Sequence, residues 1–290
     1  MASTREIRRR IRSVKNTAQI TKAMQMVAAS KMRRAQLRAL EGRPYHKLLE
    51  EIAQSLVPQA SQLRHPLLNP RPVRRRAVLV IATDKGLCGS LNTNLFREIF
   101  HRHAPDRVYV SVGRKARSFL AGLPNPTGAT LLAADFELRD NLTFRESKRI
   151  SRFLLDKFAS GEIDAIEIAH SHFVNALVQT TEIRPLVPLA LESLSQGRPA
   201  AAAPAVPDNF EPSPEELLDE LLPFFVDWNI YLAILDSLAS EHSARMIAMK
   251  NATENAKELV GDLTLEYNKA RQEGITREIL EIASAQIALD

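Results

Sequence analysis

The prolines of this chain are confined to its middle. All 16 lie between Pro44 and Pro223, so neither terminal segment contains a proline. Proline inside a helix costs about 3 kcal/mol, because it lacks the backbone N–H and clashes with the preceding turn. The distribution therefore predicts two very long terminal helices that flank a compact middle region.

Both terminal segments carry a heptad pattern. Apolar or small residues recur at alternating spacings of four and three, which is typical of the seam of a coiled coil. The pattern predicts that the two terminal helices pair with each other. The seam residues are Ile7, Ile11, Val14, Ala18, Thr21, Gln25, Ala28, Met32 and Ala35 in the first segment and Leu217, Leu221, Phe224, Trp228, Tyr231, Leu235 and Leu238 in the second.

The C-terminal stripe continues beyond these positions. The residues that extend it are Met249, Ala252, Ala256, Leu259 and Leu263. The exposed face is expected to be polar and to consist of Asn251, Thr253, Glu254, Asn255 and Lys257. The last residues then form an apolar surface wider than one partner helix covers. Because the C-terminal helix outruns the N-terminal one, we expect other chains to surround its end. We call the apolar surface that these chains are expected to surround the bearing. Its residues are Ile275, Ile279, Ile282, Ile287 and Leu289.

Charge is distributed unevenly. Residues 1–43 hold twelve Lys or Arg against Glu6 and Glu41, whereas the whole chain has a net charge of +5. Such an arm binds nucleic acid, faces acidic partner surfaces or forms a solvated helix face. A cleaved targeting segment is rejected, because the seam already begins at residue 7 and cleavage would remove its start.

Cysteine and hydropathy limit the setting. Cys88 is the single cysteine, which excludes an internal disulfide, a paired-cysteine metal site and a dithiol switch, and indicates a reducing compartment. No apolar run approaches the roughly 20 residues of a membrane span. We therefore expect any membrane association to come through partners.

The middle region alternates strands and helices. Strands are expected at residues 77–83, 108–112, 130–133 and 163–170, with helices between them, which favours a parallel sheet. A final strand over residues 180–191 contains Pro185 and Pro188 and is expected at an edge. The predicted domains are an N-terminal coiled-coil helix (1–58), a Rossmann-like α/β domain (74–192), a linker (193–212) and a C-terminal coiled-coil helix (213–290).

Three local patterns have residue types that occur in catalytic, nucleotide-binding or metal sites. The turn at residues 84–90 follows the first strand, but it has neither the GxGxxG spacing nor a phosphate loop, and Cys88 within it is expected to be buried rather than nucleophilic. His170 and His172 lie on one strand face, yet two histidines are too few to predict a metal site. His242 is expected to be a satisfied or solvated residue. We expect no catalytic residue, cofactor or metal.

Four segments in the expected order carry a family resemblance. They are ITKAMQMVAASKMRRAQ (20–36), TDKGLCGSLNTNLF (83–96), ASEHSARMIAMKNATENA (239–256) and YNKARQEGITREILEI (267–282). The chain resembles the gamma subunit of F-type ATP synthase over nearly its whole length. The resemblance implies an antiparallel coiled coil of terminal helices with a central Rossmann-like α/β domain, and a non-catalytic rotor that couples proton-driven rotation of the c ring to conformational cycling of the beta subunits.

The resemblance also implies partners and contact residues. Arg271 and Gln272 would engage the beta subunit, Lys22 and Met24 would lie at a second beta contact, and the loop with Phe210 and Glu211 would face the c ring. The partners implied are the alpha and beta subunits, the epsilon subunit and the c ring, without nucleic acid. The implied location is the cytoplasmic face of the bacterial inner membrane, as a peripheral protein.

Two other classes stay open on the residues alone. A nucleic-acid-binding coiled-coil protein would bind DNA with an affinity that falls steeply with salt. An α/β enzyme with helical additions would show a ligand-dependent melting shift. Co-purification with alpha and beta subunits from solubilised membranes separates the rotor from both.

Overall fold

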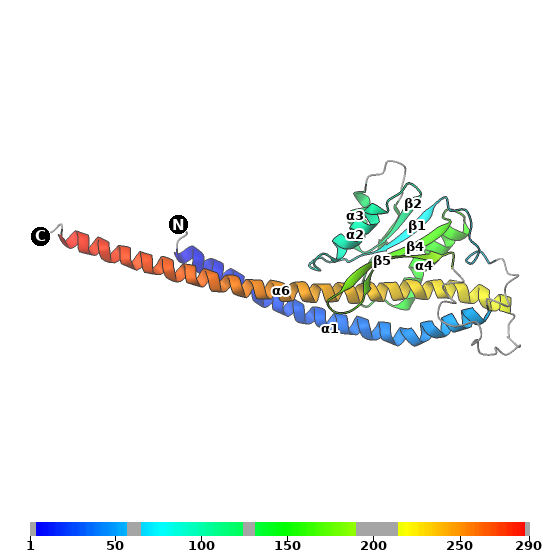
Figure 1. Ribbon diagram of the computed structural model, residues 1–290, viewed down its shortest axis with the longest axis horizontal. Coiled ribbons are helices and arrows are strands. Elements are labelled where there is room, and N and C mark those ends of the chain that lie inside the picture. The colour runs from blue at the N-terminus through cyan, green and yellow to red at the C-terminus, as the bar shows by residue number, and fades with distance from the viewer. Residues whose placement is uncertain (1–3, 57–64, 124–130, 190–213, 288–290) are drawn as a thin grey trace. The chain divides into compact units, whose positions relative to one another are not determined.

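The computed structural model describes residues 4–56, 65–123, 131–189 and 214–287. A long helix stands at each end of the chain, as expected, with alternating strands and helices between them (Figure 1). The chain divides into two compact units, Met1–Ala29 with Arg245–Asp290, and Ser30–Ala244. Its elements are α1 (Thr4–Leu56), β1 (Arg76–Ile81), α2 (Leu91–His101), β2 (Arg107–Val112), α3 (Arg114–Ala121), β3 (Leu131–Phe136), α4 (Phe144–Ala159), β4 (Ala165–Phe173), β5 (Gln179–Val187) and α6 (Pro214–Ile287).

Within Ser30–Ala244, α1 continues through Pro44 and packs on α6 through aromatic rings. The ring centroids of Tyr45 and Trp228 are 4.9 Å apart in an edge-on arrangement, which is a favourable geometry for aromatic pairs. A Cβ added at Gly42 would lie 3.2 Å from Trp228, so the missing side chain lets the indole approach the α1 backbone closely. Packing at this point offsets the cost of a proline inside the helix.

The sheet has five strands in the order β3-β2-β1-β4-β5. The pairs β1 with β2, β1 with β4 and β2 with β3 are parallel, as the alternation of strands and helices predicts. Strand β5 pairs antiparallel with β4 and forms an edge. The predicted edge position of the proline-containing strand is therefore confirmed, with Pro185 opposite Glu167 beside an irregularity in the ladder.

Helices cover both faces of the sheet. Side chains from α2 and α3, among them Leu95 and Leu120, pack on Val78 and Val80 of β1. The opposite face belongs to a larger core that takes in α4, α6 and part of α1. Alternate residues of β1 thus point into two separate cores, which requires the apolar run that its sequence shows.

Helix α6 has two buried faces in this unit, and one of them is the predicted heptad seam. The predicted seam residues Leu217, Leu221 and Trp228 are half-buried. Next to them, a second stripe is fully buried in the core beneath the sheet. This stripe also follows helical spacing, and it consists of Leu218, Leu222, Phe225, Val226, Ile230, Ala233 and Ile234.

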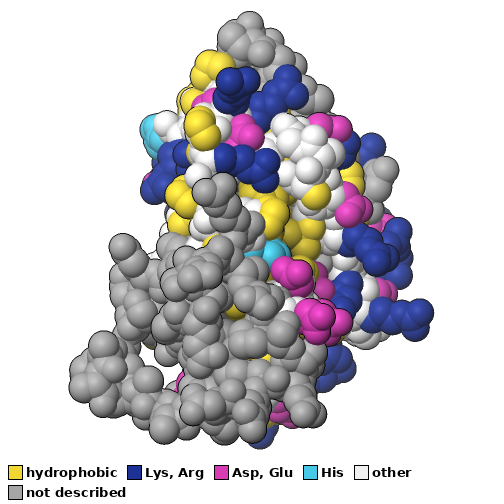
Figure 2. Space-filling model, turned by 90° about the vertical axis from the view of Figure 1, so that its right-hand side faces the viewer, with side chains coloured by type: hydrophobic (Ala, Val, Ile, Leu, Met, Phe, Trp, Pro, Cys, Tyr) yellow, Lys and Arg dark blue, Asp and Glu magenta, His cyan; other side chains and the backbone are white. Residues whose placement is uncertain are grey.

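One described helix, within residues Glu216–Leu280 of α6, is long and apolar enough to cross a membrane by length and composition. Of its most apolar window, 56% is buried inside the protein, and core helices pass the same test. Polar residues interrupt the apolar runs in this window, so it contains no continuous apolar stretch of the length expected for a membrane span. Among the described residues on the face drawn in Figure 2, Lys and Arg side chains are interspersed with acidic and apolar ones.

Candidate functional site

The first unit is an antiparallel pair of helices. Thr21 Oγ1 of α1 lies 2.7 Å from Thr253 Oγ1 of α6, and both residues are buried. Nearer the N-terminus, the Arg8 guanidinium donates a hydrogen bond to the Tyr267 hydroxyl and lies 5.3 Å from the centre of the same ring. Since residue numbers rise along α1 while those of their partners fall along α6, the helices run in opposite directions.

The predicted seam of α1 is confirmed. Every seam position from Ile7 to Ala35 is buried or half-buried, and Ile7, Thr21 and Ala28 are the buried seam positions of α1 in the first unit. Small residues such as Thr21 and Ala28 let the helix backbones approach closely. The same residues bury little apolar area, so the pairing depends partly on polar contacts such as the threonine pair.

On α6 the sequence analysis misplaced two residues. Thr253, expected on the exposed polar face, is buried against Thr21. Leu259, expected in the apolar stripe, is exposed. The reason is that a threonine fits where small residues face each other, so the contact line follows Met249, Thr253, Ala256 and Leu263.

Beyond Ala270 the described side chains of α6, which are those of residues 271–280 and Ile282, are exposed to solvent. Ile275, Ile279, Leu280 and Ile282 are 48%, 60%, 61% and 68% exposed. The pairing of Arg8 with Tyr267 places the start of α1 near Arg271, so residues 272–287 continue as a single helix for about 24 Å. We call residues 271–287 the tip. An exposed apolar stripe of this kind marks a surface that another chain covers.

The four predicted beta-contact residues lie in the same unit but in two places. Arg271, Gln272 and Lys22 are exposed, and Met24 is half-buried. In the antiparallel pair, Lys22 lies opposite the region of residue 252, about 28 Å along the axis from Arg271. The structure therefore does not bring the two pairs together, and they suit two separate contacts.

Among the described residues, Arg271 forms no ion pair with the nearby Glu266 or Glu273. An ion pair on the surface of α6 therefore does not occupy Arg271 within the described part of the chain. Its planar guanidinium is available to carboxylate or carbonyl acceptors of another chain.

Four predicted positions lie outside what the structure describes. Phe210, Glu211 and Leu289 belong to segments outside the described residues, and Ile287 ends α6 without a described side chain. Their expected roles, at the c ring for the first two and in the bearing for the others, stay predictions.

The turn after β1 satisfies its own polar groups. The Asn92 amide donates to Thr83 Oγ1 at 2.7 Å, and the Thr83 hydroxyl donates to the Lys85 carbonyl at 2.8 Å. The Asp84 carboxylate accepts the backbone N–H of Arg114 at the start of α3, at 2.8 Å. Because a protein carboxylate already binds this helix N-terminus, the turn links β1 to α2 and α3. Cys88 is buried, as expected.

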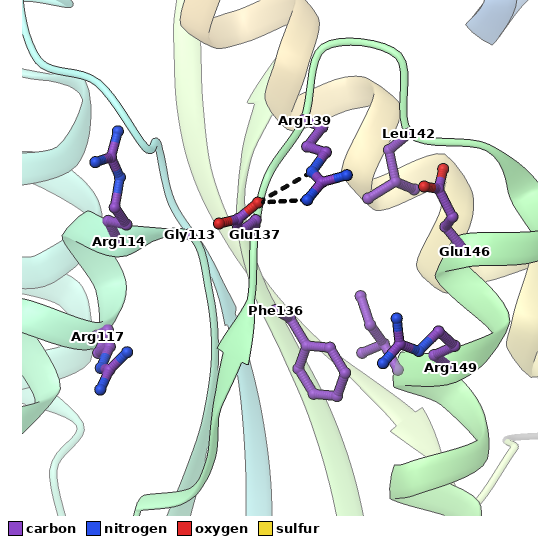
Figure 3. Close-up of a pocket in the computed structure, with 10 residues that line it drawn as sticks. Gly113, Arg114, Arg117, Phe136, Glu137, Arg139, Leu142, Glu146 and Arg149 are labelled. Atoms are coloured by element: carbon purple, nitrogen blue, oxygen red, sulfur yellow. Dashed lines mark hydrogen bonds and ion pairs between the residues drawn. The ribbon is translucent and has the colours of Figure 1, made fainter.

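A pocket of about 450 Å³ lies at the carboxyl ends of β2 and β3 (Figure 3). Arginines from α3, from the loop after β3 and from α4 surround it, and Arg139 pairs with Glu137 at 2.9 Å. At the N-terminus of α4, the Glu146 carboxylate accepts the Thr143 N–H at 2.8 Å and the Thr143 hydroxyl at 2.9 Å. These two hydrogen bonds lower the pKa of Glu146. The described lining residues include no Ser, Cys, Thr, Lys or His, and the two lining carboxylates, Glu137 and Glu146, already bind Arg139 and Thr143.

Comparison with known proteins decides the family. The sequence profile of the family described as ATP synthase matches residues 3–289. The ATP synthase gamma chain of Methylacidiphilum infernorum is 64% identical over 292 residues, covering 100% of both chains. This chain belongs to the ATP synthase gamma chain family. The gamma chain of Opitutus terrae is 48% identical, with 99% of each chain covered.

Solved structures agree with this assignment. A chain in the central stalk and c-ring structure of Tetrahymena thermophila mitochondrial ATP synthase matches with a TM-score of 0.62 and 26% identity, covering 80% of this chain and 99% of that one. A chain of the Euglena gracilis mitochondrial enzyme matches in fold, with a TM-score of 0.69 and 20% identity, covering 99% and 94%. As a gamma chain, the protein is the central-stalk rotor subunit of the ATP synthase complex and is not catalytic itself. The nucleic-acid-binding and α/β-enzyme alternatives are set aside.

Proposed function

We infer that the tip of this gamma chain turns inside a ring of alternating alpha and beta subunits. The observation that supports this most directly is the run of exposed apolar side chains on a helix that has passed the start of its partner. Apolar contacts are non-directional, so a sleeve of alpha and beta subunits can cover the stripe while the helix rotates. Hydrogen bonds fixed in direction would resist the same motion.

Contacts to the beta subunits drive the conformational cycle in this proposal. Arg271 and Gln272 at the tip, and Lys22 with Met24 farther along the pair, engage beta subunits in turn. Each contact favours one conformation of the beta subunit, and rotation moves the preference to the next subunit. Proton flow through the c ring drives this rotation during ATP synthesis.

The remaining partners are proposed from family membership. The loop that contains Phe210 and Glu211 faces the c ring, beside the epsilon subunit. The complex places this chain on the cytoplasmic face of the bacterial inner membrane, as a peripheral subunit that reaches the membrane through its partners. The gamma chains named above come from bacteria, which supports this location.

The bearing is tested at two tip positions that the chain itself leaves exposed. Changing Ile279→Asp together with Ile282→Asp places two charges inside the sleeve, so we expect loss of co-purification with alpha and beta subunits and loss of ATP synthesis in membrane vesicles. The matched control, Ile279→Leu with Ile282→Leu, keeps the apolar surface and should retain both. Equal assembly and synthesis with the two variants would contradict the bearing.

The beta contact is tested at Arg271. Arg271→Lys should lose most of the synthesis rate that Arg271→Ala loses, because a lysine keeps the charge but not the planar pair of donors. Lys269→Ala, an exposed change on the same part of α6, serves as the control. A fully active Arg271→Lys variant would reduce the role of Arg271 to its charge.

A further inference from the structure

Strand β4 carries two histidines on the sheet face that α6 covers. His170 and His172 alternate with outward residues, so they share the face of Ile166 and Ile168, which belong to the core with α6. Glu182 of β5 stands directly opposite His170 in the antiparallel ladder and therefore points to the same side. The side chain of His170 is 3% exposed.

Asp236 of α6 completes the group. Its Oδ2 atom lies 2.6 Å from His172 Nδ1 and 3.4 Å from His170 Nε2. Glu182 Oε2 lies 3.7 Å from the same His172 nitrogen. Ligand atoms of His170, His172 and Asp236 thus lie within 4.8 Å of one another, and Glu182 lies beside them, all within the unit Ser30–Ala244.

We propose that His170, His172, Asp236 and Glu182 bind one divalent transition-metal ion of the zinc class. Zinc takes imidazole nitrogen and carboxylate oxygen in tetrahedral geometry at about 2.0–2.2 Å, so neighbouring ligand atoms stand about 3.3 Å apart. The 3.4 Å and 3.7 Å separations match this spacing. The 2.6 Å contact between His172 and Asp236 has to open by less than 1 Å, with loss of the proton that the two groups share.

The surroundings hold these ligands in place. The other oxygen of Asp236 accepts the backbone N–H of Phe173 at 3.0 Å, which fixes the orientation of the carboxylate. Burial raises the pKa of Asp236, but hydrogen bonds from His170, His172 and the Phe173 N–H outweigh burial and leave that pKa lowered. The Nδ1 atom of His170 has no hydrogen-bond partner among the described residues, so the polar contact of this ring is made from Nε2 towards the cluster.

The donor set favours zinc over harder ions. Magnesium and calcium require six or more oxygen ligands, whereas half of the four donors here are imidazole nitrogens. Glu182 also lies 3.7 Å from Arg184 Nε, so Arg184 competes with the metal ion for this carboxylate. A metal ion at this point would tie α6 to two strands of the sheet.

The test uses the full-length chain after treatment with a chelator. Calorimetric titration with Zn²⁺ should show one ion bound per chain, and Co²⁺ should give the visible absorption of a tetrahedral site. His172→Ala and Glu182→Gln alter half-buried ligands, and each should weaken Zn²⁺ binding about tenfold or more. The matched control is His101→Ala, which changes an exposed histidine on α2 outside the cluster and should leave the affinity unchanged.

The outcomes separate a metal site from a simple hydrogen-bonded link between β4 and α6. Zinc should also raise the unfolding midpoint of the unaltered chain, and His172→Ala should abolish this shift. Absence of stoichiometric zinc binding by the unaltered chain would overturn the proposal. An equal loss of affinity in His101→Ala and His172→Ala, or displacement of zinc by millimolar Mg²⁺, would overturn it as well.

Discussion

His242 Nε2 of α6 lies 2.8 Å from Oδ1 of Asp140, in the loop between β3 and α4. The other carboxylate oxygen of Asp140 accepts a hydrogen bond from Lys31 of α1, and Arg38 donates to the Asp140 carbonyl at 3.2 Å. One loop residue therefore binds both long helices within the sheet-bearing unit. These contacts tie the loop between β3 and α4 to α1 and α6.

The first prediction concerns Asp140→Asn. The change removes the charge that pairs with Lys31 and His242, and because Asp140 is exposed we expect a loss of about 1 kcal/mol in the free energy of unfolding at pH 7. Urea unfolding of both proteins measures the loss. A difference of zero would show that the charge of Asp140 adds nothing to its contacts with Lys31 and His242.

The same variant gives a pH dependence. Burial raises the pKa of Asp140, but the hydrogen bond and charge of Lys31 and the contact with His242 outweigh it, so the pKa is lowered on folding. A lowered carboxyl pKa contributes stability above its unfolded value of about 3.9, and this contribution disappears as the pH falls through the folded value. The stability difference between the unaltered chain and Asp140→Asn should therefore shrink at acid pH. A difference that stays constant from pH 7 to pH 3 would contradict the assignment.

The threonine pair of the coiled coil predicts a coupling. Thr21→Val and Thr253→Val each remove the contact between the two buried hydroxyls, and the remaining hydroxyl keeps only its bond to the Ala18 or Met249 carbonyl, so each single change should cost about 1 kcal/mol of stability. The double change to valine should cost less than the sum of the two by about 0.5 kcal/mol or more, because either single change already removes the contact. Thermal unfolding of all four proteins measures this coupling. Strict additivity would mean that the two hydroxyls do not interact.

Gly113 gives the third prediction. Its φ is +91°, and a Cβ atom there would lie 2.0 Å from the Ala82 carbonyl oxygen at the end of β1. Gly113→Ala should therefore destabilise the chain by more than about 2 kcal/mol. Gly86→Ala, in the turn after β1, meets no atom within 4 Å and serves as the control. Similar urea midpoints for the two variants would contradict the close approach.

The fourth prediction separates the two buried faces of α6. Ile234 is fully buried beneath the sheet, so Ile234→Ala should cost about 2–5 kcal/mol. Leu221 on the half-buried seam loses less contact, and Leu221→Ala should cost about 1 kcal/mol. Urea unfolding of the two variants gives the ranking. A larger loss at Leu221 would mean that the seam, rather than the sheet, holds α6.

Local sequence patterns predicted some features of the structure correctly and could not predict others. The heptad seam from Ile7 to Ala35 and the edge position of Pro185 were correct, since both follow from the periodicity and backbone chemistry of nearby residues. The exposed tip was anticipated from the difference in length between the helices. The predicted beta contacts at Arg271, Gln272, Lys22 and Met24 depended on the family resemblance, because no periodic signal in the sequence marks a residue that contacts another chain.

The sequence by itself determined the long helices, their seam and the alternation of strands and helices, because these features depend on residues a few positions apart. The tertiary structure decided which strands are neighbours, that Ile234 faces the sheet, that Thr253 meets Thr21, and that Asp236 joins His170 and His172. Each of these pairs residues that are far apart in the chain. Their contacts depend on how whole elements pack, and no local period encodes that packing.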